Sequence, residues 1–352
     1  MNHIIRIGMD TSKSVFQLHG VNAAEQPVLR KRLRRSEVVA FFAKLEPTLL
    51  AMEACAASHH WARELSRFGH EVRLIPPQYV KAYVPRNKND AADAQGLCEA
   101  ASRPQMRYVP VKSAEEQADL MITGTRELLL KQRTQLSNAI RGHAAEFGLV
   151  APKGLDKIEP LLERVAAETS LPERSRKLFE LLGRQYAALE ARIDEVEAEL
   201  KAWFKTSEQA RRLAATPGLG PISASLLVMK IPAPEVFQSG RDLAAWIGLT
   251  PKDHSTAGKL RLGVITRAGD ETLRSALVCG ATAVIKQVSR GKGPNWPWLK
   301  DLLRRKAPKL AAVALANKLA RIAWKMMRTG ESFRPELMQP QDRVQARRGA
   351  AV

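Results

Sequence analysis

Four carboxylates occur at positions where a folded sheet could bring them together. Asp10 ends the run HIIRIGMD, and Glu53 ends the run TLLAME. Both runs are short and apolar, as is typical of buried strands. Asp90 and Asp93 lie three residues apart in NDAADAQGLCEAA, a predicted helix, so both project from one face. Because sites in α/β domains form at the carboxyl ends of strands, we expect the four side chains to converge.

Converging carboxylates would repel one another unless a cation lay between them. All-oxygen ligation suits hard divalent ions, and Mg²⁺ is the ion we expect. Two such ions could stabilise the attacking and leaving oxygens of a phosphoryl transfer. For any single acid a plainer role is favoured: Asp90 as a helix N-cap, Asp93 as a first-turn acid, Glu53 as a solvated strand end. The placement of all four together favours the metal site.

The charge of the chain predicts a polyanionic partner. The 352 residues include 56 Lys and Arg but only 36 Asp and Glu, which gives a formal charge of +20 and a pI near 10.2. Residues 251–352 hold 21 of these cations and 7 of the acids, an excess of 14 positive charges. We therefore expect nucleic acid as the partner, bound most strongly by the C-terminal third.

A membrane is the poorer candidate for the anionic partner. No apolar run approaches the roughly 18 residues of a spanning helix, and Asp10 interrupts the N-terminus before a signal-peptide core could form. Cys55, Cys98 and Cys279 are odd in number and far apart, which supports neither a disulfide framework nor a zinc site. These features predict a protein of the reducing cytoplasm with no membrane partner.

The order of predicted elements indicates an α/β domain followed by mostly helical ones. In the first part, strands alternate with helices, and the leading strands are expected to be antiparallel within a mixed sheet. A helix in this part is expected to begin at an N-cap, Ser36, and an Ala/Leu-rich helix is expected over residues 303–328. The predicted divisions are an α/β domain at 1–110, a helical region at 111–206, a helical domain at 207–330 and a disordered basic tail at 331–352.

Two helical stretches carry patterns that leave alternatives open. Basic residues along 113–150 predict an RNA-binding face made of Arg126, Lys131, Arg133 and Arg141. A solvated helix face explains each of them equally well. Between residues 182 and 203, apolar residues recur at alternating steps of four and three, the spacing of a coiled-coil seam and hence of a dimer. An ordinary helix packed within its own domain shows the same spacing.

The segment TPGLGPISASLLVM places Gly218 and Gly220 between two helical stretches. This pattern resembles a helix-hairpin-helix, whose backbone amides hold a phosphate without reading sequence. A helix cap would give the same residues. The strongly basic region that follows favours the phosphate-binding interpretation.

The segment DHSTAGKLRLG contains one serine, Ser255, among several positive charges. Gly258 and Gly263 break regular structure there, and no apolar residue repeats at helix or strand spacing. A serine in a polar loop is ordinarily a turn or cap residue. The surrounding cations raise the question of a chemical role.

Five motifs are similar to those of a known family. GMDTSK, AMEACAASHHW and NKNDAADA resemble the DEDD, RuvC-like domain of the transposases related to the Piv DNA invertase. TPGLGPISA and GLTPKDHSTAGKLRLGVITRAGDETLR resemble the second conserved domain of that family. The resemblance runs from about residue 4 to 328. It implies an RNase H/RuvC-like N-terminal fold and the activity of an insertion-sequence recombinase guided by a structured bridge RNA.

The resemblance also implies roles for particular residues. It makes Asp10, Glu53, Asp90 and Asp93 the Mg²⁺ ligands and Ser255 the nucleophile. A serine–DNA phosphoester would keep the energy of the broken bond, so that strands could be exchanged without ATP.

Charges near the serine suit this role. Lys259, Arg261 or Arg267 could offset the charge that builds on an attacked phosphate, and His254 could be a base or a phosphate ligand. Ala257 departs from the family, in which a glycine is frequent.

Partners and location follow from the same resemblance. It implies donor and target DNA, a bridge RNA, and a homodimer that assembles into a tetramer, with the two halves of the site supplied by different subunits. It also implies action on the nucleoid of a bacterial cytoplasm.

Two other classes of function share part of these features. A metal-dependent, structure-specific endonuclease of the Holliday-junction kind needs the carboxylates but gives Ser255 no role. A non-catalytic nucleic-acid scaffold needs only the charge. The RNA-guided recombinase uses both motifs and is the function we expect.

Overall fold

The computed structural model describes residues 3–84 and 89–338. The chain forms two compact units, Met1–Gln117 and Ala118–Val352, and the division falls inside a long helix, α5 (Ala114–Ala145). The finer division into four parts that the sequence suggests stays a prediction. Each unit is described by itself below.

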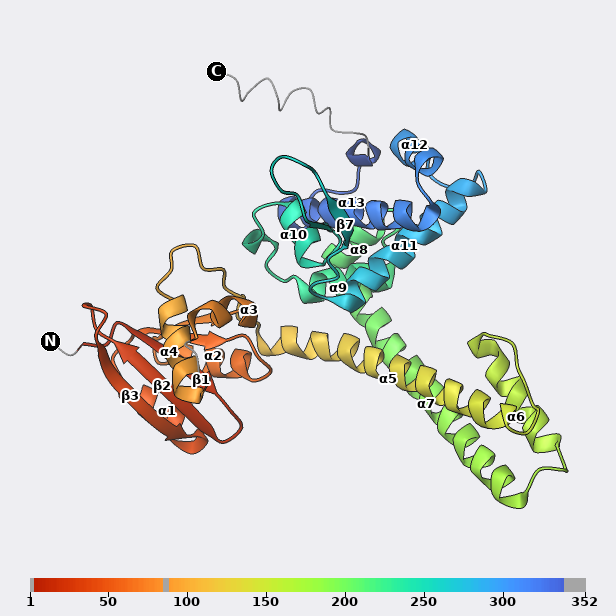
Figure 1. The fold of residues 1–352 in the computed structure, drawn as a ribbon, viewed down its shortest axis with the longest axis horizontal. Coiled ribbons are helices and arrows are strands. Elements are labelled where there is room, and N and C mark those ends of the chain that lie inside the picture. Colours follow the sequence, from red (N-terminus) through yellow and green to blue (C-terminus); the bar gives the residue numbers. More distant parts are fainter. Residues whose placement is uncertain (1–2, 85–88, 339–352) are drawn as a thin grey trace. The chain divides into compact units, whose positions relative to one another are not determined.

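A mixed sheet forms the centre of the first unit (Figure 1). Its strands are β1 (Arg6–Thr11), β2 (Val15–Val21), β3 (Pro27–Arg34), β4 (Leu49–Glu53) and β5 (Glu71–Ile75). They lie in the order β3-β2-β1-β4-β5. The pairs β1–β2 and β2–β3 are antiparallel, and the pairs β1–β4 and β4–β5 are parallel. The expected mixed sheet with antiparallel leading strands is confirmed.

Helices cover both faces of this sheet. They are α1 (Val38–Phe42), α2 (Ser58–Ser66), α3 (Pro77–Val80), α4 (Asp90–Ala100) and the 3₁₀ turns η1 (Arg35–Glu37) and η2 (Lys81–Tyr83). In β4, Leu50 and Met52 join the core formed with α1 and α2, while Ala51 joins the core that contains Leu97 of α4. Because side chains alternate across a strand, both faces of β4 must be apolar.

The first helical segment begins differently from the prediction. Ser36 lies inside η1 and is not an N-cap. The side chain of Glu37 instead accepts a hydrogen bond from the backbone N–H of Arg34, at 2.6 Å. The N-cap of η1 is thus Arg34, two residues before the expected cap, and its backbone N–H is satisfied by a side chain from inside the turn.

Helix α4 lies directly on β1 at a glycine. A Cβ atom placed on Gly8 would be 2.0 Å from the carbonyl oxygen of Ala94 and 2.5 Å from the nitrogen of Cys98. Both of these atoms are backbone atoms of α4, so they cannot move aside without moving the helix. Gly8 therefore sets the closest approach of α4 to the sheet.

The described residues of the second unit form helices and one β-hairpin. The hairpin pairs β6 (Pro251–Asp253) with β7 (Leu262–Ile265). Strands therefore include both ends of the segment DHSTAGKLRLG, and the expectation that it has no strand spacing is wrong, because Leu260, Leu262 and Val264 alternate. The helices after α5 are α6 (Ile158–Ala167), α7 (Glu173–Thr206), α8 (Glu208–Ala214), α9 (Pro221–Lys230), α10 (Gly240–Trp246), α11 (Glu271–Ser289), α12 (Pro297–Arg305) and α13 (Pro308–Thr329), with 3₁₀ turns η3 (Leu155–Lys157), η4 (Pro234–Val236) and η5 (Pro335–Met338). No helix among the described residues is long and apolar enough to cross a bilayer.

The C-terminal segment differs from the prediction in two places. The expected helix over 303–328 is broken between α12 and α13, because a proline, Pro308, disfavours helical backbone at the residue before it. The folded part of the chain also extends beyond residue 331. Met338 in η5 is buried, and its carbonyl accepts a hydrogen bond from Lys318 Nζ at 2.6 Å. The rest of the expected tail, 339–352, lies outside the described residues.

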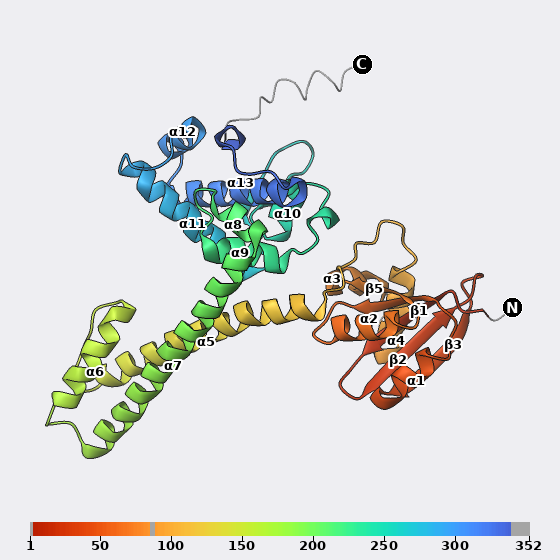
Figure 2. The ribbon, with the colours of Figure 1, turned by 180° about the vertical axis from the view of Figure 1, so that it is seen from behind.

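The heptad stripe of α7 is covered within the chain. Tyr186, Leu189 and Ile193 are buried in one core cluster with Leu136 and Ile140 of α5. Helices α5 and α7 run side by side in both views (Figures 1 and 2). The alternative of a helix packed in its own domain therefore explains the spacing, and the spacing gives no support to a dimer. Dimerisation stays a prediction.

The close approach of α4 to β1 generates a test. Gly8→Ala forces Cβ into the backbone of α4 and is expected to lower the free energy of unfolding by about 1–3 kcal/mol, the usual cost of overpacking. Urea unfolding measures this change. Gly124→Ala is the matched control, because Gly124 lies in α5 with no atom within 4 Å of its added Cβ, and alanine there should stabilise the helix slightly. Equal effects at the two positions would contradict the packing argument.

Candidate active site

The ends of β1 and β4 place Asp10 beside Glu53. The two strands are parallel neighbours, and Met9 pairs with Met52, so the next residue of each strand is a carboxylate. Just beyond them, Thr11 Oγ1 lies 3.5 Å from Cys55 Sγ, a contact that joins the two strand ends. The expected convergence of these acids at one sheet edge is borne out by the strand register.

The first turn of α4 carries the other two acids. Asn89 is the N-cap, and its Oδ1 accepts a hydrogen bond from the backbone N–H of Ala92 at 2.9 Å. The alternative in which Asp90 caps the helix is therefore wrong, since Asn89 already fills that role. Asp90 and Asp93 both lie in the first turn of a helix that packs on β1.

The four carboxylates act on one another electrostatically. Burial, and after it the negative charges of Asp93, Asp90 and Glu53, raise the pKa of Asp10 to about 6. A hydrogen bond from the backbone of Thr11 opposes this rise. Asp10 thus lies half-buried in a field of like charge.

The arrangement fits a divalent cation in chemistry but is not a formed metal site. Within the described residues, no group of three or more His, Cys, Asp or Glu side chains is arranged as ligands of one ion. The donors are nevertheless all carboxylate oxygens, and the negative charges of Asp93, Asp90 and Glu53 add to burial in raising the pKa of Asp10. Hard divalent ions bind such oxygen donors. These residues therefore fit the predicted Mg²⁺, and their joint ligation stays a prediction.

Ser255 lies exposed at the start of the loop between β6 and β7. Its backbone N–H donates to Asp253 Oδ1 at 2.8 Å, and its Oγ accepts from the backbone N–H of Arg261 at 3.0 Å. Two hydrogen bonds therefore fix this residue to both arms of the hairpin. A fixed orientation favours reaction at a nucleophile, and the same two bonds are also those of a turn-stabilising serine.

Asp253 is the titratable neighbour of Ser255 that the sequence analysis missed. Hydrogen bonds from Ser255, first from its side chain and then from its backbone N–H, lower the pKa of Asp253. His254 instead has its ring near Gly263, with Nε2 3.5 Å from the position of an added Cβ there. The spacing Asp-x-Ser, typical of an Asx turn, was the available signal.

The tip of the hairpin is a tight turn that fixes the backbone near the serine. Thr256 and Lys259 form a bridge, and the two residues between them have positive φ: +48° at Ala257 and +76° at Gly258. Two consecutive positive φ values are typical of a type I′ turn, which favours Asn-Gly. Ala257, where the family frequently has glycine, therefore adopts a left-handed conformation at a steric cost.

Three cations of the hairpin region are exposed and have no carboxylate partner among the described residues. They are Lys259, Arg261 and Arg267. Their charges are thus available to a phosphate, in agreement with the expectation. Binding of a phosphate by them stays a prediction.

The cations expected to form an RNA-binding face on α5 are occupied within the chain. Arg126 pairs with Glu197 of α7 at 2.7 Å, and Arg133 pairs with Glu190 of α7 at 3.2 Å. These two ion pairs hold α5 against α7, so we correct the expectation of one free basic face. Arg141 likewise donates to the carbonyl oxygen of Gly154.

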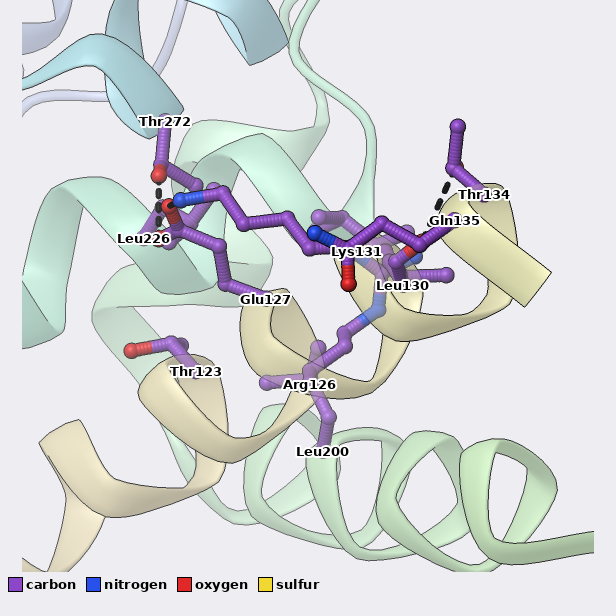
Figure 3. Close-up of a pocket in the computed structure, with 11 residues that line it drawn as sticks. Thr123, Arg126, Glu127, Leu130, Lys131, Thr134, Gln135, Leu200, Leu226 and Thr272 are labelled. Atoms are coloured by element: carbon purple, nitrogen blue, oxygen red, sulfur yellow. Dashed lines mark hydrogen bonds and ion pairs between the residues drawn. The ribbon is translucent and has the colours of Figure 1, made fainter. Parts of the chain in front are cut away.

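Lys131 lines a pocket of about 450 Å³ among α5, α7, α9 and α11 (Figure 3). Lys131 and Thr272 both point toward Glu127, and Lys131 Nζ lies 2.7 Å from its carboxylate. Hydrogen bonds from Lys131 and then Thr272 lower the pKa of Glu127. The pocket is therefore balanced in charge and offers a phosphate no free cation from Lys131 or Arg126.

The glycine-rich turn joins α8 to α9. Gly218 has a φ of +96°, and an added Cβ would lie 2.9 Å from Leu319 Cδ1 of α13. Gly218 is thus required for packing, while Gly220 is the N-cap of α9 and is exposed. Phosphate binding at this turn stays a prediction.

Comparison with known proteins identifies the family. A transposase family model described by the motif DEDD and IS110 matches residues 7–147, and a model for the IS116/IS110/IS902 transposase family matches residues 210–296. The chain is 64% identical over 335 residues to a protein of Sinorhizobium fredii named as a transposase, covering 95% of this chain and 87% of that one. The chain belongs to the IS110/IS116/IS902 family of transposases.

Further relatives agree with this assignment. A transposase for insertion sequence element IS1328 of Yersinia enterocolitica is 38% identical, over 95% of this chain and 99% of its own length. A pilin gene-inverting protein of Moraxella bovis is 24% identical, over 78% of this chain and 77% of its own. As a member of a transposase family, the chain is a DNA-processing enzyme and binds DNA.

The raised pKa of Asp10 predicts a pH-dependent stability. Because its folded pKa of about 6 exceeds the ordinary value of 3.8, the metal-free protein loses stability as the pH rises from about 4 to about 6. Asp10→Asn removes this charge. We expect it to raise the free energy of unfolding at pH 7.5 by on the order of 1 kcal/mol, after allowance for solvent screening.

Urea unfolding in EDTA across pH 4–8 tests this expectation. The gain from Asp10→Asn should vanish near pH 4, where Asp10 is protonated in the folded protein. Asp194→Asn on the exposed surface of α7 is the control and should show no such dependence. A gain for Asp10→Asn that does not change with pH would be inconsistent with crowding of the carboxylates.

The turn at the hairpin tip gives a second test. Ala257→Asn places a residue that tolerates positive φ before Gly258, and it should strengthen the turn by about 1 kcal/mol. Hydrogen exchange of the Lys259 and Arg261 amides should then slow about fivefold. Ala257→Val should have the opposite effect, because a β-branched residue resists this conformation. Unchanged exchange in both variants would show that the turn conformation is not under strain.

Proposed function

We propose that this transposase is an RNA-guided DNA recombinase that joins donor and target DNA through a transient phosphoester on Ser255. The observation that carries the proposal is the exposed serine itself. Its hydroxyl is held by the Arg261 amide, and its neighbour Asp253 is hydrogen-bonded to it. Lys259 and Arg261 lie in the same hairpin and have no carboxylate partner among the described residues. These bonds also hold the two arms of the hairpin together, and they leave Ser255 exposed beside positive charge.

The proposed chemistry conserves phosphoester bonds. Ser255 Oγ attacks a DNA phosphorus, and the bond from that phosphorus to the leaving strand breaks. The hydroxyl proton passes to the Asp253 carboxylate and then to water, while the leaving oxygen takes a proton from water. A hydroxyl of the other DNA later attacks the phosphoserine, the bond from phosphorus to Ser255 Oγ breaks, and Ser255 takes up a proton in place of the one that the attacking hydroxyl loses. Lys259 and Arg261 stabilise the charge on the attacked phosphate.

In the proposal, the first unit is an RNase H/RuvC-like domain whose carboxylates bind Mg²⁺. Asp10, Glu53, Asp90 and Asp93 would hold the ion, which supplies Lewis-acid stabilisation of phosphate charge when bound. The sheet order β3-β2-β1-β4-β5 and the crowded carboxylates support this part. Ion binding would relieve the repulsion that raises the pKa of Asp10.

The proposal includes a site completed by a second subunit of a dimer or tetramer. Leu260, Leu262 and Val264 alternate along one face of the hairpin and are 75%, 54% and 69% exposed. An apolar stripe of this kind next to a nucleophile favours contact with another protein surface. Guidance by a bridge RNA is supported by the charge of +20, because a protein that leaves sequence recognition to base pairing reads mainly backbone and shape.

A trapped covalent adduct tests the proposal. The protein with its co-purified RNA is mixed with a suicide DNA substrate, and the adduct is located by proteolysis and mass spectrometry. DNA should be found on Ser255, and Ser255→Ala should give no adduct. Lys259→Gln should slow adduct formation by about 10²–10³-fold if this cation is worth as much as an oxyanion-hole donor.

The matched control is Thr256→Ala, which removes the adjacent hydroxyl and should leave the adduct intact. RNase treatment of the protein before the reaction should prevent formation of the Ser255 adduct. DNA cutting that survives Ser255→Ala without any adduct would favour the endonuclease. An adduct on another residue would overturn the role of Ser255.

A further inference from the structure

A second concave surface of this unit begins where the serine hairpin ends. It is a groove of about 600 Å³ along the exposed face of α11, bounded by Ile265 at the end of β7 and by Val313 of α13. Arg267, Arg274 and Lys286 bring positive charge to it. We refer to it as the α11 groove.

The charges of the α11 groove differ from those on α5. Among the described residues, Arg267, Arg274 and Lys286 form no ion pair with a carboxylate, and Glu271 at one end is the acid that lines the groove. The carbonyl oxygens of Ile247 and Ala268 accept hydrogen bonds from Arg274 Nη1 at 2.9 and 3.0 Å, which fixes this guanidinium without neutralising it. The groove thus has a net positive charge held in place.

The geometry points to the α11 groove as the track for the sugar–phosphate backbone of the DNA strand that Ser255 attacks, an inference that rests on the proposed function. Arg274 and Lys286 are twelve residues apart on α11, a rise of about 18 Å. Measured along the duplex axis, that length corresponds to about five phosphates of one strand of B-form DNA. The exposed hydroxyl of Ser275 adds a donor for a phosphate oxygen, and Val278 supplies an apolar surface for the sugars.

The position of the groove relative to the serine fixes which nucleotides of the DNA strand lie in the groove. Arg261, whose amide binds Ser255 Oγ, lies four residues before Ile265, the hairpin residue that lines the groove. Four strand residues span about 13 Å, or about four phosphates along one strand. The groove should therefore hold DNA that begins about four nucleotides from the recombination junction. This continuity with the serine hairpin favours DNA over the guide RNA as the occupant.

Cys279 allows the nucleotides that lie in the groove to be identified by cross-linking, because it is exposed and lines the groove. In a Cys55→Ser background, the protein with its RNA is mixed with DNA that carries a disulfide-activated thiol tether at one chosen phosphate. Tethers about four to nine nucleotides on one side of the junction should cross-link to Cys279 at least tenfold more than tethers on the other side. Cys279→Ser should abolish the cross-link, and Cys279→Ser with Ala188→Cys on exposed α7 should not restore it.

The outcomes separate this inference from the proposed function. Absent or position-independent cross-linking, in a preparation that forms the Ser255 adduct, overturns the groove assignment and leaves the serine mechanism standing. Position-dependent cross-linking in a preparation that cuts DNA without a serine adduct supports the groove and overturns the mechanism.

The charge of Lys286 provides a second measurement. Lys286→Gln should make the slope of log K for DNA against log salt less steep by about 0.9, the value for one phosphate contact. Lys201→Gln on α7 is the matched control, since Lys201 is also an exposed helix lysine without an ion pair in the described part of the chain. This variant should leave the slope of log K for DNA against log salt unchanged. A change in the slope for the RNA alone, with none for DNA, would overturn the choice of DNA.

Discussion

The close packing of α4 on β1 is the constraint on which the candidate active site depends. Gly8 lets the backbone of α4 approach until an added Cβ would lie 2.0 Å from the Ala94 carbonyl. Burial is the largest cause of the raised pKa of Asp10, and the negative charges of Asp93 and Asp90 in the first turn of α4 add to it. The folded chain therefore maintains a repulsion that only a bound cation or a proton relieves. Strongly perturbed carboxylates are concentrated at functional sites.

In the second unit, the pairing of charges decides which cations are available to nucleic acid. Arg126 and Arg133 are about four-fifths buried and are neutralised by glutamates of α7, so they stabilise the packing of two long helices. The cations of the hairpin and of the α11 groove have no such partners among the described residues. The cations of the chain thus divide into a structural set, neutralised within the fold, and a set that can bind phosphate.

The serine hairpin combines fixed local geometry with exposed surface. Ser255 is fixed because its backbone N–H donates to the Asp253 carboxylate and its Oγ accepts from the Arg261 N–H, and the positive φ of Ala257 and Gly258 closes the turn next to it. At its base, an added Cβ on Gly269 would lie 1.8 Å from the Trp246 carbonyl, so the hairpin rises from tightly packed backbone. A nucleophile on such a hairpin is positioned by its own unit and presented outward to its substrate.

The sequence by itself determined the mixed sheet and the edge that carries Asp10 and Glu53. Strand periodicity and the end of each apolar run are local properties of the sequence. They determine which residues lie at the carboxyl ends of the strands, on the same edge of the sheet. The same local reasoning indicated the exposed loop around Ser255 and the excess of positive charge. Periodicity and charge therefore predict the parts of the site that lie within a single strand, helix or loop.

Only the tertiary structure decided what each residue contacts across elements. The heptad stripe of α7 has its partner in α5 of the same chain, and the arginines of α5 have theirs in α7, although the spacing alone fits a dimer or an RNA-binding face equally well. Asp253, Gly8 and the α11 groove also emerged only in the folded chain. The physical reason is that periodicity gives the direction of a side chain from its own helix or strand, whereas the neighbour on that side is set by long-range packing.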